Sequence, residues 1–295
     1  MELAMGNYRI QDVDLVGLAT EFGTPLYVYD AEKIVHQLKT LTMAFSGSDV
    51  KIKYAAKALT NISILKLLRM YGSDVDVVSI EEVQLALKAG FKPSQIMFTP
   101  SGVDFSEIEE GVKLRVTINL DSLSALEKFG SKYQGEYPAS IRLNPHIMAG
   151  GNYKISTGHS NSKFGISVYQ LPDIHAIVKR HKMRINGLHI HTGSDITESE
   201  VFLKIAEILF GVARDFPDLR FLDFGSGFKV AYKEGDIVTN VYDLGLKLTK
   251  AFNEFCQSYG RKLEMHFEPG KFIVSEAGVL LVKVNVVKPT PSLTF

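Results

Sequence analysis

The chain has 295 residues, of which 45% are hydrophobic and 22% charged, and its 33 basic side chains balance 33 acidic ones. A zero formal charge and a pI of about 7.1 supply no basic surface for nucleic acid or an anionic membrane. We therefore expect a small-molecule partner, no nucleic acid and no membrane.

Short apolar runs alternate with longer amphipathic segments from Lys51 onward, which is typical of repeated strand–helix units and a parallel sheet. Strands are predicted at residues 51–56, 74–78, 95–99, 116–120, 139–144, 185–190, 220–223 and 262–267. Helices are predicted at residues 62–70, 80–88, 106–112, 124–129, 171–181, 198–214 and 241–259. Eight units of this kind predict an α/β fold, a (β/α)8 or TIM barrel, which typically needs about 250 residues.

Two further strand-like segments flank the barrel, at residues 25–29 and 279–287. A two-stranded sheet is only marginally stable alone, so these segments predict a second, larger β domain. We expect residues 1–30 to belong to it, residues 31–278 to form the barrel, and residues 279–295 to begin its C-terminal part. The proline-rich end, residues 288–295, is unsuited to a sheet, so we expect a truncated β domain.

The first barrel strand ends in Tyr54-Ala-Ala-Lys57, at the mouth where active sites of this fold lie. A lysine among small and apolar neighbours is desolvated, which lowers its pKa and allows a Schiff base to form. An isolated lysine at a strand end more often extends into solvent. Polar residues at the neighbouring strand ends favour the functional interpretation of Lys57.

The sixth strand ends in a segment that contains His189, His191 and Ser194. The two histidines have strand parity, so their side chains point to one face. A single strand-end histidine is often a core residue, but two followed by Gly-Ser predict a ligand site. They are also candidate metal ligands, yet no cysteine or carboxylate at matching spacing completes a zinc set, so we expect no metal.

The seventh strand is followed by Gly225-Ser226-Gly227, and the eighth by Glu268 and Lys271. Glycines let backbone N–H groups approach an anion, at a place where barrels commonly bind phosphate. Glu268 and Lys271 are alternatively a structural ion pair. A lysine, a phosphate cradle, a flat histidine and a carboxylate are together what pyridoxal 5'-phosphate (PLP) needs, so we expect PLP as cofactor.

These residues resemble the fold-type III PLP decarboxylases, and most of all the diaminopimelate decarboxylase family. The resemblance covers nearly the whole chain, and the Ile155-Ser-Thr-Gly158 segment favours this branch over ornithine or arginine decarboxylases. The other matching segments are Gly23–Tyr29, Tyr54–Ala58, Asp76–Ser79, Ile141–Pro145, Ser162–Gly165, His189–Ser194 and Glu268–Gly270.

The resemblance implies an alanine racemase-like PLP barrel in which three residues are catalytic. Lys57 would carry the cofactor as an imine, His191 would stack on its ring, and Glu268 would face the pyridine nitrogen. Asp76 and Arg142 would line the pocket near the imine.

The phosphate of the cofactor would be held by Ser194 and by Gly225, Ser226 and Gly227. Lys271 stands where many relatives have arginine, so it would offer phosphate or substrate carboxylate a point charge without a bidentate fork.

The implied activity is decarboxylation of meso-2,6-diaminopimelate to L-lysine, by a homodimer in the full-length form. In the family a C-terminal β domain supplies a cysteine segment, a tyrosine and substrate-binding groups, whereas Cys256 is expected in a helix core. We therefore expect the chain to bind PLP with little turnover.

Three alternatives stay open at this point: a PLP-binding barrel without turnover, a non-catalytic partner subunit, and a decarboxylase for another basic amino acid. A single cysteine and the absence of a signal-peptide pattern lead us to expect a cytoplasmic location.

Overall fold

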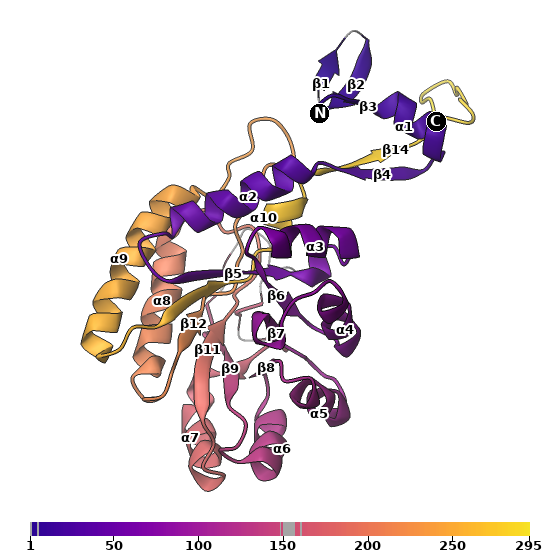
Figure 1. The fold of residues 1–295 in the computed structure, drawn as a ribbon. Coiled ribbons are helices and arrows are strands. Elements are labelled where there is room, and N and C mark those ends of the chain that lie inside the picture. The colour runs from indigo at the N-terminus through magenta and orange to yellow at the C-terminus, as the bar shows by residue number, and fades with distance from the viewer. Residues whose placement is uncertain (1, 5, 148, 150–156, 160) are drawn as a thin grey trace.

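Eight parallel strands close into a barrel in the computed structural model, which describes residues 2–4, 6–147, 149, 157–159 and 161–295. Each strand pairs with the next, and the last pairs with the first (Figure 1). All eight predicted strands are confirmed: β5 (Val50–Ala55), β6 (Asp74–Val77), β7 (Ile96–Phe98), β8 (Thr117–Leu120), β9 (Ala139–Asn144), β11 (Ile185–Ile190), β12 (Phe221–Asp223) and β13 (Glu264–Phe267). A short β10 (Ile166–Ser167) pairs with β9 outside this ring.

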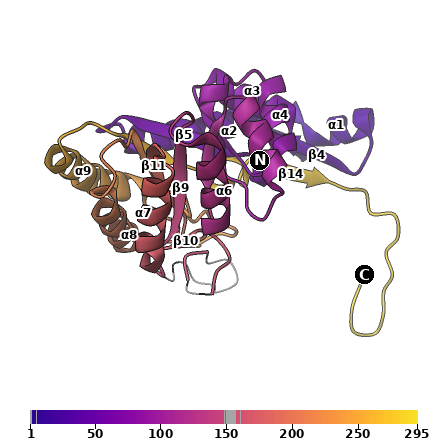
Figure 2. The same ribbon diagram turned by 90° about the horizontal axis from the view of Figure 1, so that it is seen from below.

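The helices surround the barrel and bury its outer face (Figures 1 and 2). All seven predicted helices are present: α3 (Ile62–Met70), α4 (Ile80–Lys88), α5 (Phe105–Lys113), α6 (Leu123–Tyr133), α7 (Leu171–Arg180), α8 (Ser199–Ala213) and α9 (Val241–Tyr259). Short 3-10 turns η1 (Ala56–Ala58), η2 (Pro93–Gln95) and η4 (Val168–Gln170) and the short α10 (Lys271–Val274) complete this part. No helix in the described ranges combines the length and apolarity required to span a membrane.

Strand sequence explains why the barrel closes around a polar interior. On β5, Ile52 and Tyr54 belong to the hydrophobic core, whereas the alternate residues Lys51 and Lys53 line a cavity at one barrel mouth. Because side chains alternate between the two faces of a strand, apolar residues pack under the helices and polar ones point into the barrel. The interior therefore supplies functional groups at both mouths.

The sequence analysis missed helix α2 (Ala31–Ala44), which lies between α9 and α3 and completes the ring of helices. The Asp30 side chain caps it by accepting a hydrogen bond from the Lys33 N–H. Buried Ile34, Leu38 and Leu41 follow helical spacing, so the signal was present in the sequence.

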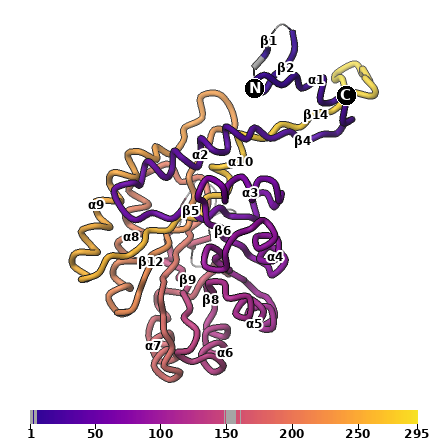
Figure 3. Tube along the Cα trace, in the orientation of Figure 1, coloured from indigo at the N-terminus to yellow at the C-terminus, as the bar shows by residue number. Residues whose placement is uncertain are grey.

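A small β ribbon extends from the barrel, where β4 (Leu26–Tyr29) pairs antiparallel with β14 (Gly278–Leu281). Beyond it lie β1 (Glu2–Ala4), β2 (Asn7–Ile10), β3 (Val13–Asp14) and α1 (Leu15–Phe22), and the tube trace shows both termini in this region (Figure 3). The predicted strand 279–287 is too long, because the four residues of β4 pair only with Gly278–Leu281. Residues 282–287 have no strand partner among the described residues.

Candidate active site

Lys57 lies in η1, directly after β5, at the C-terminal mouth of the barrel. Its Nζ is 3.7 Å from the Asp76 Oδ2 at the end of β6. Burial, followed by the charge of Glu268, raises the pKa of Asp76 to about 7. The expectation of a desolvated lysine is wrong, because the Lys57 side chain is 50% exposed beside the open mouth.

Glu268 follows β13 and is buried against His189 of β11, with 3.1 Å between Oε2 and Nε2. Burial alone would raise the pKa of Glu268, but His189 and the charge of Lys57 outweigh it and hold the pKa well below its usual value. The other imidazole nitrogen, Nδ1 of His189, lies 3.0 Å from the Asn119 amide nitrogen. An amide donor at Nδ1 leaves the ring proton on Nε2, facing the carboxylate.

The Gly225–Gly227 turn follows β12 and packs against His191. The φ angles are +60° at Gly225 and +131° at Gly227, and a β-carbon at Gly227 would lie 2.6 Å from the Gly193 carbonyl oxygen. Only glycine fits such a backbone. The Ser226 N–H donates to His191 Nδ1 over 3.3 Å, and burial, followed by the charges of Lys57 and Arg142, lowers the pKa of His191 well below its usual value.

Arg142, on β9, is buried at the same mouth, and its guanidinium lies 4.8 Å from the Phe164 ring centroid. Ser194, in the turn after β11, is half-buried. The Thr157 hydroxyl donates to the His191 carbonyl over 2.8 Å, which brings one end of the Ile155–Gly158 segment to the site. Ile155 and Ser156 lie outside the described residues.

Lys271 opens α10 at the rim of the same mouth. Its Nζ lies 2.9 Å from Asp195 Oδ1 and donates to the Tyr232 hydroxyl over 2.8 Å. The ammonium is therefore already paired with Asp195, a residue that the sequence analysis gave no role.

Three site residues escaped the sequence analysis: Thr99, Asn119 and Asp223. The Thr99 hydroxyl donates to Asp76 over 3.0 Å, and the Asn119 amide reaches Thr99 over 3.3 Å, so a buried network joins Asp76 to His189 and Glu268. Asp223 accepts the Gly225 N–H over 2.8 Å and thereby fixes the glycine turn. A polar residue inside an otherwise apolar strand, as in Ile118-Asn119-Leu120, was the available signal.

His189, Asp223 and Glu268 each offer a ligand atom, and these atoms lie within 4.8 Å of one another. Histidine and carboxylate are ligand types that zinc takes. Sequence spacing did not reveal these two carboxylates, which β12 and β13 bring to His189 in the fold. Burial and the charge of Glu268 raise the pKa of Asp223 well above its usual value.

Residues 31–275 match the family described as pyridoxal-dependent decarboxylase, pyridoxal binding domain. Over 96% of this chain and 68% of the relative, the sequence is 34% identical to the diaminopimelate decarboxylase of Methanothermobacter thermautotrophicus. The chain belongs to the diaminopimelate decarboxylase family of pyridoxal-dependent decarboxylases.

Other members of the family agree in sequence and structure. The Escherichia coli K12 diaminopimelate decarboxylase is 32% identical over 96% of this chain and 67% of its own length. The Helicobacter pylori diaminopimelate decarboxylase, solved in complex with L-lysine, superposes with a TM-score of 0.85 at 33% identity, over 94% of this chain and 71% of that chain. The M. jannaschii enzyme, also solved with L-lysine, gives a TM-score of 0.85 at 27% identity, over 99% and 71%. These structures share the barrel fold described above.

The donor set at this mouth fits the cofactor of the family. Glu268 Oε1 is buried and has no hydrogen-bond partner among the described residues, as expected of a carboxylate that awaits a ligand. The turn leaves no room for a β-carbon at Gly225 or Gly227, and the Lys57 amine is accessible. An amine, a tight glycine turn, an imidazole and a free carboxylate oxygen are the groups that PLP requires.

Proposed function

We propose that this chain binds PLP at the C-terminal mouth of its barrel and that the natural gene product decarboxylates meso-2,6-diaminopimelate to L-lysine. One observation carries the proposal: the Lys57 amine beside Asp76 and the buried Glu268 carboxylate lie at the same mouth of the barrel. The Oε1 of Glu268 has no hydrogen-bond partner among the described residues. Membership of the diaminopimelate decarboxylase family supports the reaction and the substrate.

When bound, PLP supplies the electron sink that accepts the charge left behind by the departing carboxylate. Lys57 would hold the cofactor covalently through its Nζ amine. Gly225, Ser226, Gly227 and Ser194 would hold the phosphate, and the neutral imidazole of His191 would offer its flat face to the ring.

Glu268 would keep a proton at the pyridine nitrogen of the cofactor, because its low pKa keeps the carboxylate charged and its Oε1 has no partner among the described residues. His189 acts as a positioning residue. Its Nε2 proton faces Glu268 Oε2 and orients the carboxylate, and Asn119 fixes the tautomer from the far side of the ring.

Asp76 is suited to hold or release a proton beside the Lys57 amine, since its pKa of about 7 lies near neutral pH. Arg142 adds a fixed positive charge at the same mouth. Lys271 lies at the rim, where its ammonium pairs with Asp195, and would offer a point charge to the cofactor phosphate or to a substrate carboxylate.

Turnover by the natural gene product tests the proposal. PLP-saturated protein is incubated separately with meso-2,6-diaminopimelate, L-ornithine and L-arginine, and carbon dioxide and the amine product are measured. We expect L-lysine from diaminopimelate alone, and Lys57→Ala should abolish it. Faster release from ornithine or arginine would instead indicate another basic amino acid, and PLP binding with no turnover would indicate a non-catalytic barrel.

We also propose the cytoplasm as location, a homodimer as assembly, and a β domain built from residues 1–30 and 279–295 beside the barrel of residues 31–278. The β4–β14 pairing, which joins both flanking segments, supports that division. Sedimentation of the natural gene product at several concentrations tests the assembly, and a monomer at all of them would contradict the homodimer.

A further inference from the structure

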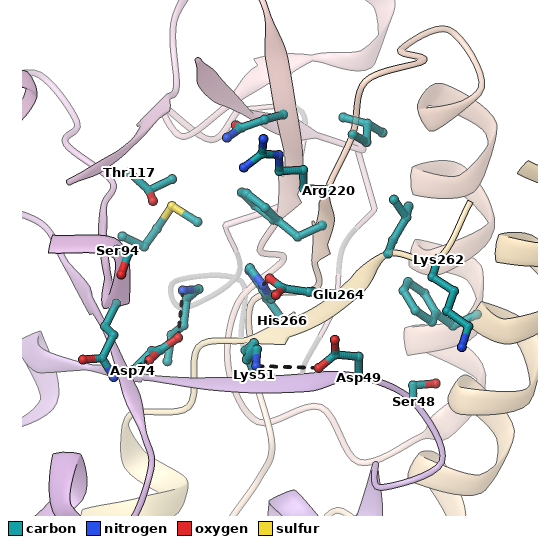
Figure 4. A pocket seen from close by; sticks show the side chains of 18 of the residues that line it. Ser48, Asp49, Lys51, Asp74, Ser94, Thr117, Arg220, Lys262, Glu264 and His266 are labelled. Carbon is teal, nitrogen blue, oxygen red and sulfur yellow. Dashed lines mark hydrogen bonds and ion pairs between the residues drawn. The ribbon is translucent and has the colours of Figure 1, made fainter. Parts of the chain in front are cut away.

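A large polar cavity opens at the N-terminal mouth of the barrel, at the opposite end from the candidate active site. Its volume is about 2020 Å³, whereas ordinary small-molecule sites have roughly 300–1,000 Å³. Figure 4 shows side chains from the first residues of several barrel strands around it, including Lys51, Asp74, Thr117 and Glu264. The cavity therefore reaches into the barrel itself.

Lys53, one of the residues that line this cavity, is a buried cation with spare hydrogen-bonding capacity. Its side chain is only 5% exposed, and its Nζ lies 3.5 Å from Asp74 Oδ2. The other Asp74 oxygen already accepts a hydrogen bond from Gln95 over 3.0 Å. An ammonium has three donors, and within the described ranges none of them makes a hydrogen bond. Barrel interiors are usually filled by branched apolar side chains, so a lysine here calls for an explanation.

The lining of the cavity carries an excess of positive charge. Its carboxylates are Asp49, Asp74 and Glu264, and each already contacts a cation or an imidazole. Against these three stand eight cations: Lys51, Lys53, Arg69, Lys92, Arg115, Arg220, Arg261 and Lys262. Only Lys51 and Lys53 form an ion pair with another described residue.

Strand order concentrates part of this charge on one wall. Strands β12, β13 and β5 are neighbours, and Lys51 lies beside His266 in the sheet register. Arg220 directly precedes β12 and is exposed at the same mouth (Figure 4). Its side chain makes no hydrogen bond within the described part of the chain.

We propose that this cavity binds a small organic anion with two or more negative charges on phosphate or carboxylate groups. Lys51, Lys53 and Arg220 are the residues we expect it to contact. A multivalent anion meets several cations at once and supplies acceptors to the buried Lys53 ammonium. The proposal stands apart from the proposed function, because PLP and substrate occupy the other mouth.

His266 provides a natural reporter inside the cavity. Its imidazole is buried, stacks on Phe221 with 4.3 Å between ring centroids, and holds Glu264 through Nε2 over 2.9 Å. Its Nδ1 makes no hydrogen bond with any residue that the structure describes, and it lies 3.8 Å from Asp223 Oδ2. An anion beside Lys51 and Lys53 changes the electric field at this ring, so its NMR signals report occupancy at this mouth.

The test titrates PLP-saturated protein with pyrophosphate and, separately, with citrate at constant ionic strength. PLP saturation keeps added phosphate out of the Gly225–Gly227 turn. Calorimetry measures affinity, and the His266 imidazole signals report location. We expect saturable binding of at least one anion with a shift of the His266 signals, and the preferred probe identifies phosphate or carboxylate chemistry. Failure of both anions to saturate, or saturation without a His266 shift, overturns the proposal.

Charge-removing variants locate the site independently. Lys51→Gln with Arg220→Gln should weaken binding at least about tenfold, because two charge-assisted contacts are lost. Lys204→Gln, an exposed lysine on α8 outside the cavity, is the matched control and should bind like the unaltered protein. Should the double variant fail to fold by circular dichroism, Arg220→Gln alone gives the same comparison. Unchanged affinity in these variants would place the anion elsewhere and refute the site.

Discussion

The two mouths of the barrel use the same strands but arrange charge differently. Strand β5 carries Lys51 and Lys53 towards one mouth and leads to Lys57 at the other. At the C-terminal mouth the charged groups lie in matched contacts, such as Lys57 with Asp76 and Glu268 with His189. At the N-terminal mouth most cations have no ion-pair partner among the described residues, since only Lys51 and Lys53 form such pairs. Matched contacts fix geometry for chemistry, whereas cations without an ion-pair partner favour the binding of an anion.

The largest expected effect concerns the buried pair at the N-terminal mouth. Asp74→Asn leaves the buried Lys53 ammonium without a counter-charge and should lower the free energy of unfolding by about 3–5 kcal/mol. Urea unfolding measures it. Asp49→Asn is the control, since Asp49 is 65% exposed where it pairs with Lys51 and should change stability by about 1 kcal/mol or less. If the two substitutions lowered the free energy of unfolding equally, the loss of Asp74 would not leave a costly buried charge on Lys53.

At the C-terminal mouth, Gly227→Ala places a β-carbon against the Gly193 carbonyl at a φ of +131°. The strain should cost about 1–3 kcal/mol and distort the turn that we propose holds the phosphate, so PLP affinity should fall roughly 10–100-fold. Absorbance titration with PLP measures this. Gly235→Ala, also at positive φ but with open space around it, should retain PLP affinity. Similar losses in both variants would separate the turn from cofactor binding.

The strands of both mouths could be predicted from sequence, but their partnerships could not. Apolar alternation in β5 and β13 located the strands, and glycine and charge at strand ends located Lys57, Gly225 and Glu268. Sequence does not show which distant residues meet, so the contacts of His189 with Asn119 and of Lys271 with Asp195 emerged only from the fold.

The exposure of the Lys57 side chain and the length of β14 could not be predicted from the sequence either. Lys57 was expected to be desolvated, and its half-exposed side chain depends on how wide the mouth is. The end of β14 is set by the four residues of its partner β4. Helix α2, in contrast, had a readable apolar spacing and was overlooked.

Glu268→Gln tests whether the charge of this carboxylate is needed at the C-terminal mouth. Glutamine keeps the shape but holds no negative charge where we propose the pyridine nitrogen lies. PLP binding should persist, and decarboxylation by the natural gene product should slow at least about tenfold, or roughly 1.4 kcal/mol of barrier. Glu254→Gln, an exposed glutamate on α9, should leave the rate unchanged. An unaltered rate in Glu268→Gln would make this carboxylate structural.

Asp76 gives an effect on stability that depends on pH. Its pKa is raised from 3.8 to about 7 in the folded chain, so its neutral form is favoured, and stability is lost as pH rises from about 4 to about 7. This loss amounts to up to about 1.4 kcal/mol of unfolding free energy for each pH unit. Asp76→Asn should remove it, because asparagine does not ionise. Urea unfolding of the PLP-free protein at several pH values measures the slope. Asp218→Asn, at an exposed site, should keep the slope, and a slope that Asp76→Asn leaves intact would contradict the raised pKa.

The most direct measurement is the site of covalent attachment at the C-terminal mouth. The protein is saturated with PLP, reduced with borohydride and digested, and the pyridoxyl-labelled peptide is sequenced by mass spectrometry. Lys57 is the accessible amine beside Asp76, so the label should fall on Lys57 and vanish in Lys57→Ala. Label on another lysine, such as Lys53 at the opposite mouth, or no label on Lys57 after saturation, would contradict the account.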